Sequence, residues 1–91
     1  MPVRLRIDRR VEKAISRMSQ LERERAQRAF TQFQTDPRYP GLNLEKLQGH
    51  LNLWSFRINR SVRVLLRPVP GAADETWELL DIGPHDIYRR L

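Results

Sequence analysis

The chain has 91 residues, of which 40% are hydrophobic and 31% charged, so its composition is typical of a single globular domain spanning residues 1–91. It carries 17 basic residues against 11 acidic ones, for a net charge of +6. The chain has no cysteine and its four glycines are scattered, which excludes disulfides, thiolate zinc sites and glycine-rich nucleotide-binding loops.

All the basic residues except Lys13 and Lys46 are arginines. Arginine suits bidentate recognition of phosphate or carboxylate groups, although a genome rich in arginine codons would give the same bias. No apolar run approaches the roughly 20 residues that span a bilayer, and the N-terminal residues lack an apolar signal core. We therefore expect a cytoplasmic protein that does not contact a membrane.

Alternating apolar residues and arginines over 3–7 predict a short strand with one buried face. Asp8 is then in position to cap a first helix. The apolar residues of that helix follow helical spacing: Val11, Ala14, Ile15 and Met18.

Ser19 and Glu22 have the spacing of a capping box and predict the start of a second helix. Its apolar face comprises Ala26, Ala29, Phe30 and Phe33. The helix should end before Pro37, because proline disfavours helical geometry in the residue before it. Together the two helices predict a helical hairpin.

The second half of the sequence is rich in β-branched and aromatic residues. It predicts strands over 42–47, 51–58, 62–67 and 76–82, with a turn at Gly49-His50 and a loop over 68–75. The order of one strand, two helices and four strands predicts an α+β fold, in which the helical hairpin packs on a largely antiparallel sheet of four to five strands.

The strands 51–58 and 62–67 fix their own register. A three-residue loop at 59–61 pairs apolar residues with each other, whereas a two-residue loop would place Arg63 in the core opposite Phe56. The predicted pairs are Ile58 with Val62, Phe56 with Val64, and Trp54 with Leu66. Asn59 or Ser61 would support the turn.

This register places Arg57 directly opposite Arg63 on the face away from the helices, with Arg67 further along the same strand. Like charges in directly opposed positions destabilise a sheet. Either solvent or a carboxylate such as Glu45 or Asp81 neutralises the pair, or the pair binds an anion. We favour an anion site, because arginine binds phosphate well.

The helical hairpin and the segments 44–49, 54–59, 62–66 and 81–89, in this order, resemble the RelE/ParE superfamily of bacterial toxins, which belong to type II toxin–antitoxin modules. The resemblance implies a RelE-like fold. It also implies one of two activities: RelE-like members cut mRNA on the ribosome, and ParE-like members inhibit DNA gyrase.

In RelE-like members, arginines of the central strands and a terminal His or Arg with a Tyr serve the cleavage. The resemblance therefore implies catalytic roles for Arg57, Arg63, His85 and Tyr88. Lys46, near the Lys-Leu-Gln-Gly element, together with Arg60 and Arg67, would bind RNA. Asp86 stands beside His85, where many members have another basic residue.

RNA cleavage without metal or cofactor needs a base for the 2′-hydroxyl, an acid for the leaving 5′-oxygen and positive charge around the phosphorane. His85 is the candidate acid or base near neutrality. Tyr88 would transfer a proton, stack on a base or lock the C-terminal segment onto the sheet. Two distant histidines without a carboxylate cluster do not indicate a metal site.

The leading hypothesis is a toxin that cuts mRNA on the ribosome and is held inactive by an acidic cognate antitoxin. One alternative is a ParE-like inhibitor of DNA gyrase without nuclease activity. In a third hypothesis the arginine face only docks the antitoxin.

Overall fold

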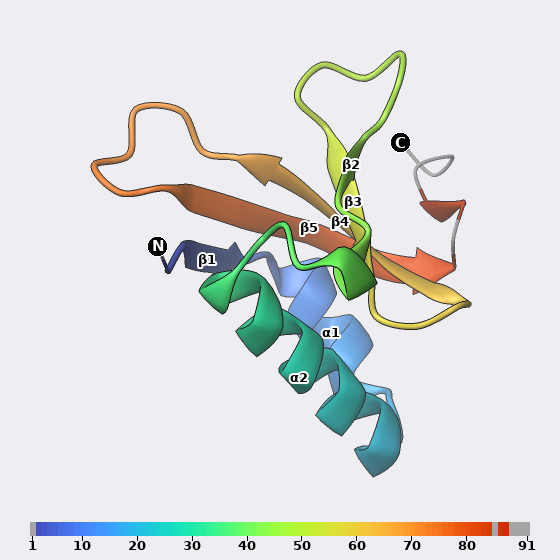
Figure 1. Ribbon diagram of the computed structural model, residues 1–91. Helices are drawn as coiled ribbons and strands as arrows, with labels where there is room; N and C mark the ends of the chain where they lie inside the picture. The colour runs from blue at the N-terminus through green and yellow to red at the C-terminus, as the bar shows by residue number, and fades with distance from the viewer. Residues whose placement is uncertain (1, 85, 88–91) are drawn as a thin grey trace.

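The computed structural model describes residues 2–84 and 86–87, in which two helices pack against a five-stranded sheet (Figure 1). The elements in chain order are β1 (Arg4–Ile7), α1 (Arg9–Ser16), α2 (Gln20–Thr35), the 3-10 helix η1 (Pro40–Leu42), β2 (Glu45–Lys46), β3 (Trp54–Arg57), β4 (Val62–Pro68) and β5 (Thr76–Pro84). The strand order is β1-β5-β4-β3-β2, with β1 parallel to β5 and the other neighbours antiparallel. The predicted α+β architecture is confirmed.

Both predicted helix caps are present. The side chain of Asp8 accepts a hydrogen bond from the Arg10 backbone N–H at 2.9 Å. Ser19 Oγ accepts from the Glu22 N–H at 3.2 Å, and Glu22 Oε1 accepts from the Ser19 N–H at 2.9 Å. These hydrogen bonds with Ser19, together with the positive charge of Arg25, hold the pKa of Glu22 below its ordinary value of 4.5.

Aromatic rings form the centre of the core between α2 and the sheet. The Phe33 ring stacks on Phe56, with ring centroids 4.9 Å apart, and meets Trp77 edge-on at 5.6 Å. The predicted apolar face of the second helix is buried: Ala26, Ala29, Phe30 and Phe33. The helices thus cover one face of the sheet, which fixes the opposite face of β3 and β4 as the outward one.

The predicted hairpin register is confirmed. Trp54 pairs with Leu66 and Phe56 pairs with Val64 across β3 and β4. Asn59 supports the turn, since its Oδ1 accepts from the backbone N–H groups of Ser61 at 2.8 Å and Val62 at 3.0 Å.

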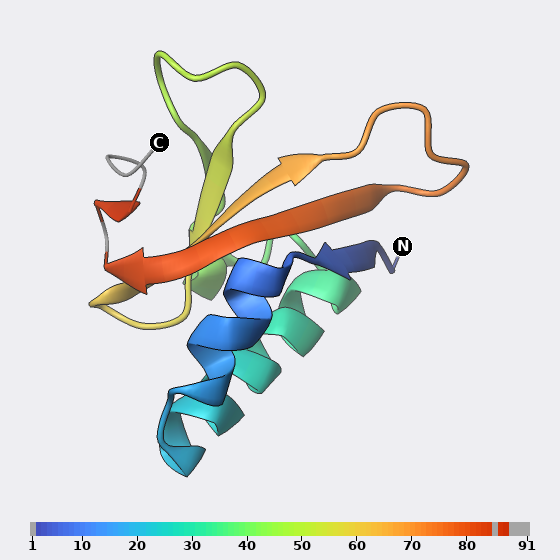
Figure 2. The same cartoon turned by 180° about the vertical axis from the view of Figure 1, so that it is seen from behind.

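Two predicted strands are shorter than expected. The segment 42–47 begins with the end of η1 and keeps only the two-residue β2, and the strand predicted from residue 51 begins at Trp54. Asn43 and Asn52 have φ values of 50° and 51°, which interrupt extended backbone at both places. Leu51 is consequently 93% exposed. The loop 47–53 projects from the end of the molecule opposite the helices (Figure 2).

The outward face of the sheet carries a small apolar cluster of its own. Leu65 pairs with Asp81 and Leu66 with Leu79, so Leu80 is the extra residue of a bulge in β5. Leu65 is buried there together with Leu53 and Ile87.

None of the helices in the described part of the chain has the length and apolar character needed to cross a membrane.

Candidate functional site

Arg57 at the end of β3 lies directly across from Arg63 on β4, as the sequence predicts. Their neighbours along the strands, Phe56 and Val64, are fully buried against the helices. Because side chains alternate along a strand, Arg57 and Arg63 belong to the opposite face of the sheet. Leu65, two positions from Arg63, belongs to the outward cluster. The two guanidinium groups therefore start from the same outward face of the sheet.

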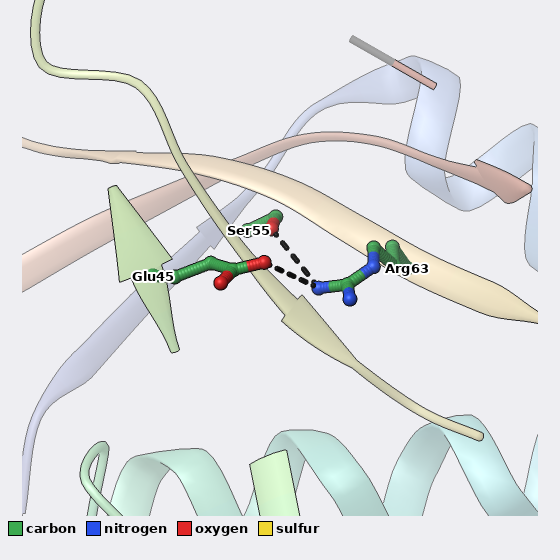
Figure 3. A network of polar contacts seen from close by, with 3 residues as sticks. All are labelled: Glu45, Ser55 and Arg63. Atoms are coloured by element: carbon green, nitrogen blue, oxygen red, sulfur yellow. Dashed lines mark hydrogen bonds and ion pairs between the residues drawn. The ribbon is translucent and has the colours of Figure 1, made fainter. Parts of the chain in front are cut away.

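Arg63 is held by two residues of the neighbouring strands (Figure 3). Its Nη1 donates to Glu45 Oε1 at 3.2 Å and to Ser55 Oγ at 3.4 Å. Glu45 pairs with Ser55 across β2 and β3, which brings its carboxylate to the face of Arg63. The side chain of Arg63 is 19% exposed and that of Glu45 is 51% exposed, so the pair sits at the rim of the sheet face.

The sequence favoured an anion site over neutralisation of the opposed arginines by a carboxylate, and for Arg63 this ion pair corrects that expectation. Glu45 compensates Arg63, which is the alternative that the sequence left open. The physical reason is that a largely buried guanidinium beside a second one is costly unless a carboxylate lies within reach. Arg57 is half-buried and makes no side-chain ion pair or hydrogen bond with any residue in 2–84 or 86–87.

The three predicted RNA-binding residues do not form one patch with Arg63. Arg67 lies further along the outward face and forms an ion pair with Glu78 at 2.9 Å. Lys46 pairs with Trp54, whose side chain packs on the core, so the register places it on the helix side of the sheet. Arg60 is exposed in the turn between β3 and β4.

The predicted catalytic residues His85 and Tyr88 lie outside the described residues. Their described neighbour Ile87 is 1% exposed and packs with Leu53 and Leu65. The chain therefore returns to the outward face of the sheet at residue 87.

In the described part of the chain, no cluster of three or more His, Asp or Glu residues is arranged to hold a metal ion.

From the sequence, Glu45 was expected only as a group that neutralises the arginines. Its Oε1 accepts from Arg63, and no described residue donates to its Oε2. A half-exposed carboxylate that is oriented by a guanidinium can accept a proton from a bound hydroxyl group. The signal for this role was the strand alternation that places Glu45 and Ser55 on one face, but β2 has only two residues to carry it.

No protein-family model matches the sequence, and no curated protein matches it significantly. Solved structures do resemble the fold. A RelE–RelB complex from Pyrococcus horikoshii gives a TM-score of 0.73 at 21% identity, covering 92% of this chain and 96% of that chain. A YoeB/ParE toxin from Agrobacterium tumefaciens gives 0.71 at 17% identity, covering 90% and 98%. A mutant of the E. coli toxin RelE in the free state gives 0.70 at 17% identity, covering 98% and 93%. The chain has the RelE-like α+β fold.

Proposed function

We propose that residues 1–91 form a single toxin domain of the RelE/ParE superfamily, from a type II toxin–antitoxin module, and that it inhibits translation by cutting mRNA on the ribosome. The shared fold over at least 90% of the chain supports the superfamily. The net charge of +6 suits a ribosomal RNA environment.

The observation that carries the nuclease proposal is the hydrogen-bonded pair of Glu45 and Arg63 on the outward face. In this proposal Glu45 accepts the proton of the 2′-hydroxyl as its oxygen attacks the adjacent phosphorus. Arg63 orients the carboxylate and, with Arg57, stabilises the charge that builds on the phosphorane. The bond from phosphorus to the 5′-oxygen then breaks, leaving a 2′,3′-cyclic phosphate.

The leaving 5′-oxygen requires a proton, and we propose His85 as its donor. Tyr88 would stack on a neighbouring base. The scheme uses only side chains and requires no metal or cofactor. In this proposal Lys46, Arg60 and Arg67 bind RNA. Lys46 would do so on the other face of the sheet from Arg63.

The proposed partners are the ribosome, its mRNA and an acidic cognate antitoxin, all in the cytoplasm. One of the similar structures is a RelE–RelB complex, which supports the antitoxin. An acidic segment would also be attracted by the excess of positive charge on this chain.

The test is induced expression followed by mapping of the 5′ ends of cellular mRNA. Wild-type protein should create new ends within translated messages, and Glu45→Gln should abolish them. Asp74→Asn is the matched control, because it also removes the carboxylate of an arginine ion pair, at 3.2 Å from Arg4, but on a distant loop. Unchanged messages in cells that contain abundant, folded wild-type protein would reject the nuclease proposal.

A second candidate is a ParE-like gyrase inhibitor without nuclease activity, because one of the similar structures is a YoeB/ParE toxin. In that case expression should accumulate gyrase–DNA cleavage complexes without new mRNA ends. Glu45→Gln and His85→Ala would leave this accumulation unchanged.

A further inference from the structure

Two adjoining hollows lie at the edge of the molecule where α2, η1 and β3 meet. One measures about 360 Å³ and the other about 440 Å³, and both are lined by Tyr39. We propose that together they form a groove that binds single-stranded RNA, separate from the pair of Glu45 and Arg63. We name it the Tyr39 groove.

The first hollow is lined by cations and amides from two elements. Arg25, Arg28 and Gln32 belong to α2, while Arg57 and Asn59 belong to the end of β3 and its turn. Residues 25, 28 and 32 follow each other by one helical turn, so they form a row along one side of α2. This row and the end of β3 provide positive charge along a path that an RNA backbone could follow.

The second hollow shares Tyr39 with the first. Arg38, Asn43 and Trp54 contribute to its lining. Lys46 on β2 pairs with Trp54 on β3, so Lys46 lies at the β2 edge of the sheet. Lys46, which was predicted to bind RNA and does not share the face of Arg63, is thus a strand partner of a lining residue, although it lines neither hollow itself.

The charged residues that line the Tyr39 groove are all positive. None of the described residues that line either hollow is acidic. Arg28, Arg38 and Arg57 make no side-chain ion pair with a described residue, in contrast to Arg4, Arg63 and Arg67. Several uncompensated guanidinium groups around one groove repel each other and attract a polyanion.

Aromatic and amide groups favour RNA over an acidic peptide as the occupant. Tyr39 is 47% exposed and Trp54 is partly exposed, and such rings can stack on unpaired bases. Amide side chains can hydrogen-bond the edges of bases.

The Tyr39 groove goes beyond the proposed function, since it requires no cleavage. Arg57 borders both surfaces, because it lies opposite Arg63 and also lines the first hollow. RNA held in the groove would therefore run towards the outward face at the end of β3. Loss of the groove should weaken RNA binding, whereas loss of Glu45 should not.

The test measures binding of a fluorescein-labelled, 2′-O-methylated 12-nucleotide single-stranded RNA, which cannot be cleaved, by fluorescence anisotropy. Tyr39→Ala should weaken binding about tenfold, and Tyr39→Phe should bind like wild type, since it keeps the stacking ring. Arg28→Gln should reduce the slope of log K against log salt by about 0.7, the share of one phosphate contact on a single strand. Arg10→Gln, an equal charge change on an exposed residue of α1 outside both hollows, should leave the slope unchanged.

Circular dichroism and thermal unfolding establish that each variant is folded. The inference is overturned if folded Tyr39→Ala and Arg28→Gln bind the RNA as Arg10→Gln does. It is also overturned if these variants lose binding of a glutamate-rich peptide but keep RNA binding, which would make the groove a peptide site. RNA binding that depends on Tyr39 in a protein that cuts no mRNA would support the groove and reject only the nuclease.

Discussion

Arg57 and Arg63 occupy directly opposed positions on β3 and β4, yet among the described residues only Arg63 has a carboxylate partner. Glu45 reaches Arg63 from β2, and Ser55 holds the same Nη1. The two arginines are therefore not equivalent. Arg63 is fixed in an ion pair, and Arg57 keeps its charge available at the boundary between the outward face and the Tyr39 groove.

The first prediction concerns the dependence of this arrangement on Glu45. Glu45→Gln should lower the free energy of unfolding by about 1 kcal/mol, because it leaves the largely buried Arg63 uncompensated beside Arg57. The partial exposure of Glu45 keeps the loss below that of a fully buried pair. Urea denaturation at neutral pH measures it.

The control removes the repulsion between Arg57 and Arg63 instead of the attraction between Glu45 and Arg63. In the Glu45→Gln background, Arg57→Gln should recover part of the lost stability, because the opposing charge is gone. In the wild-type background the same change should have a smaller effect. Strictly additive effects would mean that the contribution of Arg57 does not depend on the compensation of Arg63 by Glu45.

The sequence specified the hairpin because apolar residues alternate strictly on both strands. Only one loop length pairs Phe56 with Val64, and the structure has that pairing. The starts of β2 and β3 were not predictable in the same way, because they depend on positive φ values at Asn43 and Asn52. Asparagine tolerates this conformation but also occupies ordinary strands and loops, so its presence does not identify the break.

The candidate site was predictable only within one pair of strands. The opposition of Arg57 and Arg63 follows from their own hairpin, whereas the partner of Arg63 depends on the register of β2. That strand has two residues, Glu45 and Lys46, which is too short for an apolar pattern to fix their faces. The sequence therefore assigned Lys46 to RNA binding only through the resemblance, and left Glu45 as one of several possible partners of the arginines.

The second prediction tests the turn that sets the register between β3 and β4. Asn59→Ala should cost about 1 kcal/mol, because the N–H groups of Ser61 and Val62 lose their shared acceptor Oδ1. Asn59→Asp keeps an acceptor at the same place and should retain most of the stability. Equal unfolding free energies for Asn59→Ala and wild type would show that the backbone alone maintains the three-residue turn.

The third prediction concerns pH. The pKa of Glu22 is lowered in the folded protein, so its contribution to stability is present above the ordinary value of 4.5 and is lost as pH falls through the folded value. Glu22→Gln should remove this part of the acid dependence, because glutamine can accept the same hydrogen bond without titrating. Thermal unfolding from pH 7 to pH 3 measures the difference, with Glu24→Gln as the variant of equal charge that leaves the capping box intact. Identical acid dependence in wild type and Glu22→Gln would contradict the prediction.

The fourth prediction concerns the attachment of residue 87 to the outward face. Ile87 is 1% exposed and packs with Leu53 and Leu65, and Leu65 pairs with Ser55, the residue that holds Arg63. Ile87→Ala should therefore cost about 2–4 kcal/mol, and Ile87→Val about 1 kcal/mol, as expected when methyl groups are removed from a packed cluster. Urea denaturation of both variants provides a graded comparison. If Ile87→Ala unfolds at the same urea concentration as wild type, the packing of Ile87 on Leu53 and Leu65 does not hold residue 87 on the outward face.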